Sequence, residues 1–288
     1  MCRASFWRVQ AVSYYLTLGN SLSRNSRMRM MFGCGCFCVS KIYIGCFVSL
    51  CVVIEGLRFM VVAGKVFKLS ESLSIADIAE RLGDYRIEEE FEEGDYRFAL
   101  VTEVVGLVPK SGLLRGVYSH DFVLRVFHRG KVIPQPRTVE AVFSFAEQYG
   151  KTFLTVVEKK RVANYIANKL SELLFEKAGS IVEARISPET LKEFHLRNPE
   201  DTKISFFDNV DIPNVNKLSL YGPDLTNTSL FEDYAKHGDL WYVVARSKEF
   251  GYVVGITRDA SVTIFNLPVT EKEKYLEYTT KQIHPLTT

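Results

Sequence analysis

Apolar and polar residues alternate with a changing period along the chain, and the first change predicts a strand followed by a helix. Residues 65–70 alternate with the period of a strand, whereas the residues after Ser74 follow a helical period. Ser74 with Asp77 three residues later is a typical helix N-cap, and Gly83 stands where the helix should end. The apolar face of this helix consists of Ile75, Ile78, Ala79 and Leu82.

The middle of the chain is rich in residues that favour strands. Strands are predicted over 96–108 and 121–128, with Gly, Pro and Ser between them, and a further strand over 152–157. Between these strands, residues 138–150 predict a short helix that begins at a threonine and ends at a glycine. The strongest helical pattern covers 158–178, and its apolar positions are Val162, Ile166, Leu170, Leu173 and Leu174.

The last part of the chain predicts further strands and helices. The predicted strands are 180–186, 217–221, 240–247, 251–258 and 261–267, and the predicted helices are 188–197, 228–237 and 270–282. The last three strands follow one another at short turns, which indicates an antiparallel meander. The predicted fold is therefore α+β, with antiparallel strands interspersed with amphipathic helices, a closing meander and a polar C-terminal helix.

Composition divides the chain into unlike segments. All six cysteines lie at or before Cys51, whereas all nine prolines lie at or after Pro109. Residues 1–59 carry seven Lys/Arg and one acid, a net charge of +6, and residues 60–288 have a net charge of −4. The overall charge is therefore no argument for nucleic-acid binding, and a disulfide-stapled scaffold is excluded for the larger segment. That segment is described as an N-terminal α+β half, 60–178, and a C-terminal α+β half, 179–288.

Three interpretations of residues 1–59 stay open. The first is an over-extended reading frame, because Glu55-Gly56 can be encoded by a purine-rich stretch placed like a prokaryotic ribosome-binding site before Met60. The second is a membrane anchor through residues 42–54, a run shorter than the roughly 18–20 apolar residues of a spanning helix. The third is a metal site made of Cys34, Cys36, Cys38, Cys46 and Cys51. We expect a cytoplasmic protein, with membrane anchoring as the alternative.

An acidic run lies between the first helix and the next predicted strand. It consists of Glu88, Glu89, Glu90, Glu92, Glu93 and Asp95. Such a run is either a site for a metal or a basic partner, or a strand edge kept soluble by its charge. The second interpretation is favoured, since charged edges protect a sheet from pairing with other chains.

The sequence contains no motif that dictates a chemistry. Phosphate-binding glycine loops, a zinc-protease motif and a hydrolase nucleophile motif are absent from it, so no catalytic residue, cofactor or metal is assigned. His120, Asp121 and His128 are the alternative, since two histidines of equal strand parity next to an acid suit a metal-dependent or small-ligand enzyme.

Basic residues form a more suggestive group. The candidates for contacts with DNA phosphates are Arg115, Arg125, Arg129, Lys131, Arg137, Lys159, Lys160 and Arg161. The last three begin the predicted helix over 158–178, where positive charge opposes the helix dipole and therefore does not serve helix stability. A local basic surface on an acidic protein can still neutralise phosphates.

The order of elements resembles the recombination-associated protein RdgC family over most of 65–267. The similar segments are VFKLSESLSIADIAERL, FVLRVFHRGKVIPQP, FLTVVEKKRVANYIANKLSELL and YGPDLTNTSLFEDYAKHGDLWYVVARSKEFGYVVGITRDASVTIFNL. Compared with that family, this body is shorter, and the stretch between Pro136 and Thr152 is reduced.

The resemblance implies a non-enzymatic protein linked to recombination or replication. Such a protein binds duplex DNA without sequence preference and forms a homodimeric ring with a basic inner surface. Two alternatives stay open beside it. One is the enzyme that would use His120, Asp121 and His128, and the other is a membrane-anchored protein-interaction domain.

Overall fold

A computed structural model describes residues 52–54, 57–59, 61–110, 112–198, 202–223, 225 and 228–287, all within one compact unit of the chain. Residues 1–51, and with them the cysteine cluster and most of the apolar run over 42–54, lie outside the described residues. In the described part, no helix combines the length and the apolar character that a membrane span requires.

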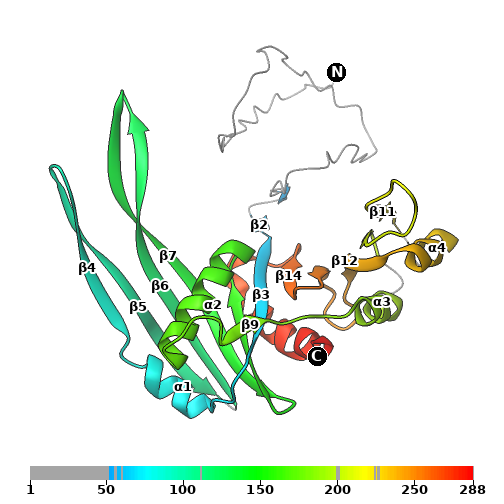
Figure 1. Cartoon of the computed structure of the whole chain (residues 1–288), viewed down its shortest axis with the longest axis horizontal. Helices are drawn as coiled ribbons and strands as arrows, with labels where there is room; N and C mark the ends of the chain where they lie inside the picture. The colour runs from blue at the N-terminus through cyan, green and yellow to red at the C-terminus, as the bar shows by residue number, and fades with distance from the viewer. Residues whose placement is uncertain are drawn as a thin grey trace, which may run out of the picture. The chain divides into compact units, whose positions relative to one another are not determined.

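A twelve-stranded antiparallel sheet organises this unit, in the order β11-β10-β12-β13-β14-β3-β8-β7-β6-β5-β4 with β9 also paired to β3 (Figure 1). Its strands are β3 (Val62–Leu69), β4 (Arg86–Glu93), β5 (Tyr96–Lys110), β6 (Leu113–His128), β7 (Lys131–Gln148), β8 (Lys151–Val157), β9 (Ile181–Glu183), β10 (Ile204–Asp208), β11 (Leu218–Tyr221), β12 (Asp239–Arg246), β13 (Val253–Thr257) and β14 (Ser261–Ile264). A separate hairpin pairs β1 (Val52–Ile54) with β2 (Leu57–Phe59). The antiparallel sheet and its helices confirm the predicted α+β class.

The helices begin where the sequence places caps. They are α1 (Ile75–Leu82), α2 (Lys160–Phe175), α3 (Pro188–Arg197), α4 (Ser229–His237) and α5 (Lys272–Tyr278), with short turns η2 (Val269–Glu271), η3 (Thr279–Ile283) and η4 (His284–Leu286) around the last. The Ser74 hydroxyl accepts a hydrogen bond from the Asp77 amide at 3.1 Å, as predicted for an N-cap. Ser187 caps α3 in the same way through the Thr190 amide.

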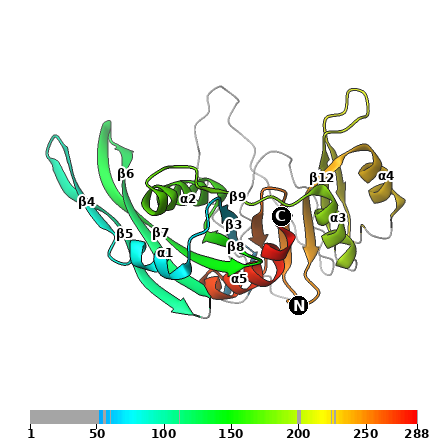
Figure 2. The same ribbon diagram turned by 60° about the horizontal axis from the view of Figure 1, so that its bottom comes forward.

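Two hydrophobic cores lie on opposite faces of the central strands. On β3, Val66 belongs to one core and Phe67 to the other, and on β8 Val157 and Val156 divide likewise, because successive side chains of a strand alternate between faces. Helices α1 and α2 cover the face of Phe67, whereas α5 covers the opposite face (Figure 2). The sheet continues through both halves expected from the sequence, since β14 and β9 pair with β3.

The prediction of a helix over 138–150 is wrong, because most of this segment forms the second half of strand β7. Val139, Ala141, Phe143 and Phe145 recur at every second position and share one face, and the last three are buried in the core beneath α1 and α2. This period-two pattern, with two phenylalanines, outweighs the capping residues at the ends of the segment.

The C-terminal helical segment covers the predicted range 270–282 but is less polar than predicted. Helix α5 spans Lys272–Tyr278 and continues directly into the π-helical turn η3, and Tyr275, Leu276 and Tyr278 are buried against the sheet. The five glutamates of the acidic run lie on the exposed edge strand β4, which pairs with β5 at the end of the described sheet, and Asp95 lies in the turn between the two strands. That placement agrees with the favoured interpretation, a strand edge kept soluble by its charge.

Candidate nucleic-acid interface

Strands β6 and β7 form an unusually long ribbon. They have 16 and 18 residues and pair along their whole length up to His128 and Lys131. Neighbouring strands accompany them only part of the way, because β5 pairs with β6 as far as His120, and β8 pairs with β7 as far as Val142. Residues 121–138, called the distal ribbon below, are thus a two-stranded projection from the sheet (Figure 1).

Four of the candidate basic residues lie on the distal ribbon. Arg125 Nη2 is 2.7 Å from Glu93 Oε2 on β4, whereas Arg129, Lys131 and Arg137 are exposed and have no acidic partner within the described residues. Arg129 and Gly130 form the two-residue turn between the strands, both with positive φ, as hairpin turns of this length require.

Three further candidates lie at the start of α2, where the Glu158 carboxylate accepts a hydrogen bond from the Lys159 amide at 3.2 Å. Lys159 is the N-cap residue, its side chain makes no capping hydrogen bond, and no acidic residue occupies the first turn. The free backbone N–H groups of a helix start attract anions, and the Lys159 and Arg161 side chains add positive charge there. Both side chains are exposed and lack an acidic partner among the described residues.

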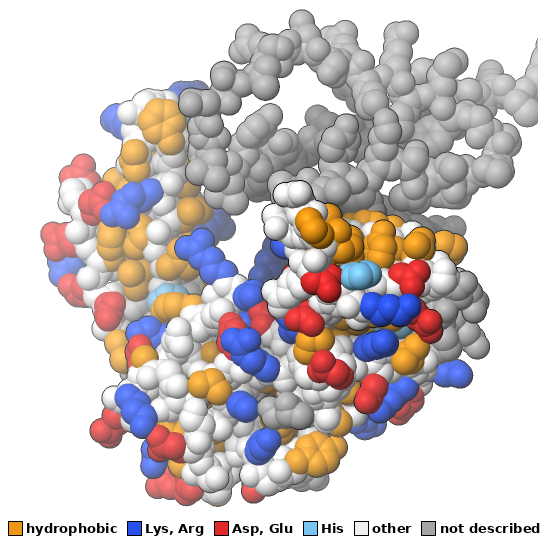
Figure 3. Space-filling model, turned by 45° about the vertical axis from the view of Figure 1, so that its right-hand side comes forward, with side chains coloured by type: hydrophobic (Ala, Val, Ile, Leu, Met, Phe, Trp, Pro, Cys, Tyr) orange, Lys and Arg blue, Asp and Glu red, His pale blue; other side chains and the backbone are white. Residues whose placement is uncertain are grey.

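The start of α2 lies beside the base of the distal ribbon. The Tyr165 hydroxyl is 3.2 Å from Nε2 of His120, and their rings are 5.3 Å apart. Arg161 precedes Tyr165 by one helical turn, and Arg137 pairs with Phe122, two residues beyond His120 toward the tip. Figure 3 shows a hollow between the long strands and the rest of the body, with Lys and Arg side chains on both of its sides.

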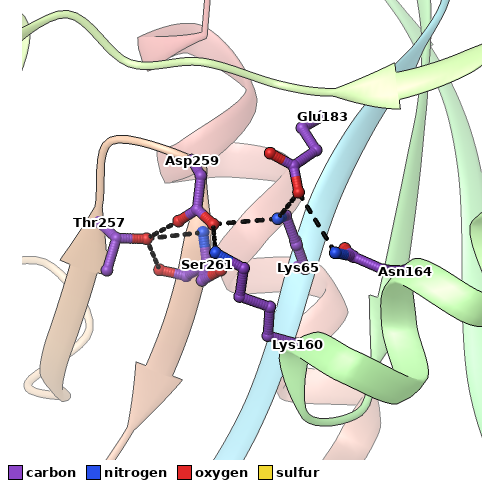
Figure 4. A network of polar contacts seen from close by, with 7 residues as sticks. All are labelled: Lys65, Lys160, Asn164, Glu183, Thr257, Asp259 and Ser261. Carbon is purple, nitrogen blue, oxygen red and sulfur yellow. Dashed lines mark hydrogen bonds and ion pairs between the residues drawn. The ribbon is translucent and has the colours of Figure 1, made fainter.

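A buried ionic network fixes the position of α2 (Figure 4). Lys65 on β3 is fully buried and donates hydrogen bonds to Glu183 on β9 and, at 3.0 Å, to Asp259 between β13 and β14. Asp259 also pairs with Lys160 at 2.5 Å, and Asn164 Nδ2 is 3.3 Å from Glu183 Oε1. The network therefore joins the first turns of α2 to three other elements of the fold.

Asp259 is the charged centre of this network. Burial opposes its ionisation, but hydrogen bonds from Lys160, Thr257 and Lys65 outweigh burial and hold the pKa of the Asp259 carboxyl well below its usual range. The same contact raises the pKa of Lys160. Lys160 thus serves to anchor α2, whereas its neighbours Lys159 and Arg161 stay available to a ligand.

Arg115 does not join the other candidates. It lies near the base of β6, paired in register with Ser144, and forms an ion pair with Glu273 of α5 on the face opposite α2. The structure therefore divides the eight predicted basic residues. Five of them are exposed and have no acidic partner in the described part of the chain, three on the distal ribbon and two at the start of α2: Arg129, Lys131, Arg137, Lys159 and Arg161.

The alternative site of His120, Asp121 and His128 is not assembled. His120 is held by Thr102 Oγ1 at 2.8 Å and by Tyr165, and burial lowers its pKa. The adjacent Asp121 points to the other face of β6, and His128 lies at the far end of the strand. The described residues contain no cluster of three or more His, Cys, Asp or Glu that could hold a metal.

Two other histidines are buried in the core of the C-terminal half. His195 stacks on Phe231 with ring centroids 3.7 Å apart, and its two ring nitrogens have no hydrogen-bond partner within the described chain. His284 lies 3.0 Å from Thr155 Oγ1 and 3.1 Å from Gln148 Oε1. Burial lowers the pKa of each histidine from 6.5 to about 4.

These two histidines predict a loss of stability in mild acid. The folded chain takes up their protons only near pH 4, whereas the unfolded chain takes them up near pH 6.5, so stability is complete above about pH 7 and falls as the pH decreases. Between pH 7.5 and 5 the free energy of unfolding should decrease by about 2 kcal/mol for each histidine.

Urea unfolding at these two pH values measures the effect. His195→Phe should remove about half of the dependence, because phenylalanine fits the stacked position and does not titrate. Equal stability of the parent protein at both pH values would contradict the prediction.

Comparison with models of known protein families gives no match, and comparison with curated proteins finds no relative. The features of the chain that remain to be explained are the distal ribbon, the start of α2 and their five exposed basic residues.

Proposed function

We propose that this protein binds duplex DNA without sequence preference, through phosphate contacts made by the distal ribbon and the start of α2. The observation that carries the proposal is the start of α2, where Lys159 and Arg161 stand exposed against the helix dipole and beside a cationic ribbon. Positive charge at this position does not stabilise the helix, so we infer that these two side chains bind an external anion.

Phosphates match this surface better than single acidic side chains do. The five basic residues lie on two separate elements, so a ligand that contacts all of them must carry negative charges in a series. A nucleic-acid backbone does so, and each phosphate neutralised by Lys or Arg releases condensed counterions. The surplus of acidic residues elsewhere in 60–288 limits such binding to these two elements.

The shape of the distal ribbon favours a duplex. The major groove of B-DNA admits a two-stranded antiparallel ribbon, and basic residues at the tip and side of such a ribbon lie close to the flanking phosphates. Phosphate contacts carry no sequence information by themselves, so binding should depend little on base sequence. The resemblance of the element order to the RdgC family points to the same activity.

Fluorescence anisotropy with two unrelated labelled duplexes of equal length tests this proposal. The dissociation constants should agree within about threefold, since nonspecific affinity comes from the phosphates. An unlabelled duplex should compete, whereas polyglutamate at the same charge concentration should compete weakly, because its charges are not spaced along a rigid helix. Failure to bind either duplex at low salt would refute the function, and a large preference for one would refute its sequence independence.

A further inference from the structure

The tip of the distal ribbon presents two exposed apolar side chains. Phe127 is 73% exposed, more than any other large apolar residue described, and Val132 is 54% exposed. The two residues are directly paired in register, so their side chains project from the same face of the ribbon. Single exposed apolar residues are common in proteins. Here an exposed phenylalanine and an exposed valine are paired at the end of a projecting hairpin, where they form a small apolar patch.

Positively charged residues surround this small apolar patch. Arg129 lies in the turn that follows Phe127 and His128, and Lys131 precedes Val132. Arg125 lies two residues from Phe127 on the same face of β6. No acidic residue occurs between Phe122 and Arg137, so the tip repels basic protein surfaces and favours an anionic partner with apolar faces. Stacked base pairs between two phosphate backbones have both properties.

We propose that Phe127 inserts between stacked base pairs of the bound duplex and bends it, with Val132 filling the opened step beside the ring. This inference rests on the proposed DNA binding and adds a change of DNA shape to it. Proteins that bend DNA insert apolar side chains as wedges between base steps, although unstacking the bases costs free energy. Stacking of the aromatic ring on a base offsets this cost.

The surrounding cations make the insertion feasible. Arg129 and Lys131 can neutralise phosphates next to the opened step, which reduces the repulsion between backbones that bending brings together. Base steps that kink easily should therefore be bent more than stiff A-tracts.

Energy transfer between dyes on the two ends of a duplex of about 25 base pairs measures the bend. The full chain at saturating concentration should bring the ends closer than in free DNA. Phe127→Ala should abolish this change while lowering affinity by no more than about tenfold, because the phosphate contacts remain. Phe127→Trp should keep the bend. Tyr149→Ala is the matched control, since Tyr149 is a 71% exposed aromatic residue at another hairpin turn and should have no effect.

The outcomes separate the two proposals. Wild-type protein that binds the duplex but leaves its ends at the free distance overturns the insertion and leaves DNA binding intact. Equal bending by wild-type and Phe127→Ala protein also overturns it. If sedimentation shows that Phe127→Ala disrupts self-association without changing the bend, the tip is an interface between copies of the chain, and the insertion is again refuted. Absence of duplex binding refutes both proposals together.

Discussion

Replacing Lys65 by methionine is expected to lower the free energy of unfolding by about 3 kcal/mol. Methionine has nearly the length of lysine and is apolar, so the change removes the charge while it fills the space. The loss leaves Glu183 without its buried cation and Asp259 with one fewer hydrogen bond. Removing one partner of a buried ion pair is costly, but the remaining Glu183 and Asp259 side chains are 36% and 20% exposed and Asp259 keeps Lys160, so the expected loss is at the low end for such pairs. Since Lys65 joins β3 to both β9 and the β13–β14 turn, the two halves of the sheet should loosen together.

Equilibrium unfolding in urea measures this effect, and two further variants define its cause. Lys177→Met removes an exposed ion pair with Glu71 and should cost less than about 1 kcal/mol. Adding Glu183→Gln to Lys65→Met should recover part of the stability, because the uncompensated charge is then gone. A loss below about 1 kcal/mol for Lys65→Met would show that the network contributes little to the fold.

Reversing the charge of Lys159 and Arg161 together should weaken duplex binding by at least about tenfold near 0.1 M salt. Two phosphate contacts are lost, and two glutamates then repel the backbone. Folding stability should stay unchanged or increase slightly, because both side chains are exposed and acidic residues at a helix start interact favourably with its dipole. Lys160 is left in place because it anchors α2 to Asp259.

The control is a double reversal of the same net charge, Lys192→Glu with Lys236→Glu, on helices α3 and α4. Both residues are exposed and lie away from the distal ribbon and α2. Anisotropy titrations should therefore show nearly unchanged affinity for this variant. Equal losses in both double variants would mean that overall charge governs binding, and no loss in the first would remove α2 from the interface.

The sequence correctly predicted the helices and strands that depend on residues close to one another in the chain. The α1 and α3 caps need only a serine and a nearby amide, and the meander β12–β14 needs only strands joined by short turns. The prediction of a helix over 138–150 was wrong because a threonine and a glycine at the ends of this segment suggested helix boundaries. Counting the period of Val139, Ala141, Phe143 and Phe145 would have given the strand.

The site could be predicted only in part, because its assembly depends on distant segments. The sequence named the basic residues, but it could not separate Arg115, which faces α5, from those of the distal ribbon and the start of α2. It also missed Lys65, whose carboxylate partners lie 118 and 194 residues further along the chain. In the predicted strand 65–70, a lysine next to valine and phenylalanine reads as an ordinary solvent-facing position.

The salt dependence of duplex binding by the full chain is the most direct test of the proposed function. Anisotropy titrations at several salt concentrations give the dissociation constant as a function of salt. If the five exposed basic residues of the distal ribbon and the start of α2 contact phosphates, the logarithm of the binding constant should fall with the logarithm of salt with a slope of about −4 to −5. A slope near zero, or no binding at the lowest salt concentration, would contradict DNA binding through this surface.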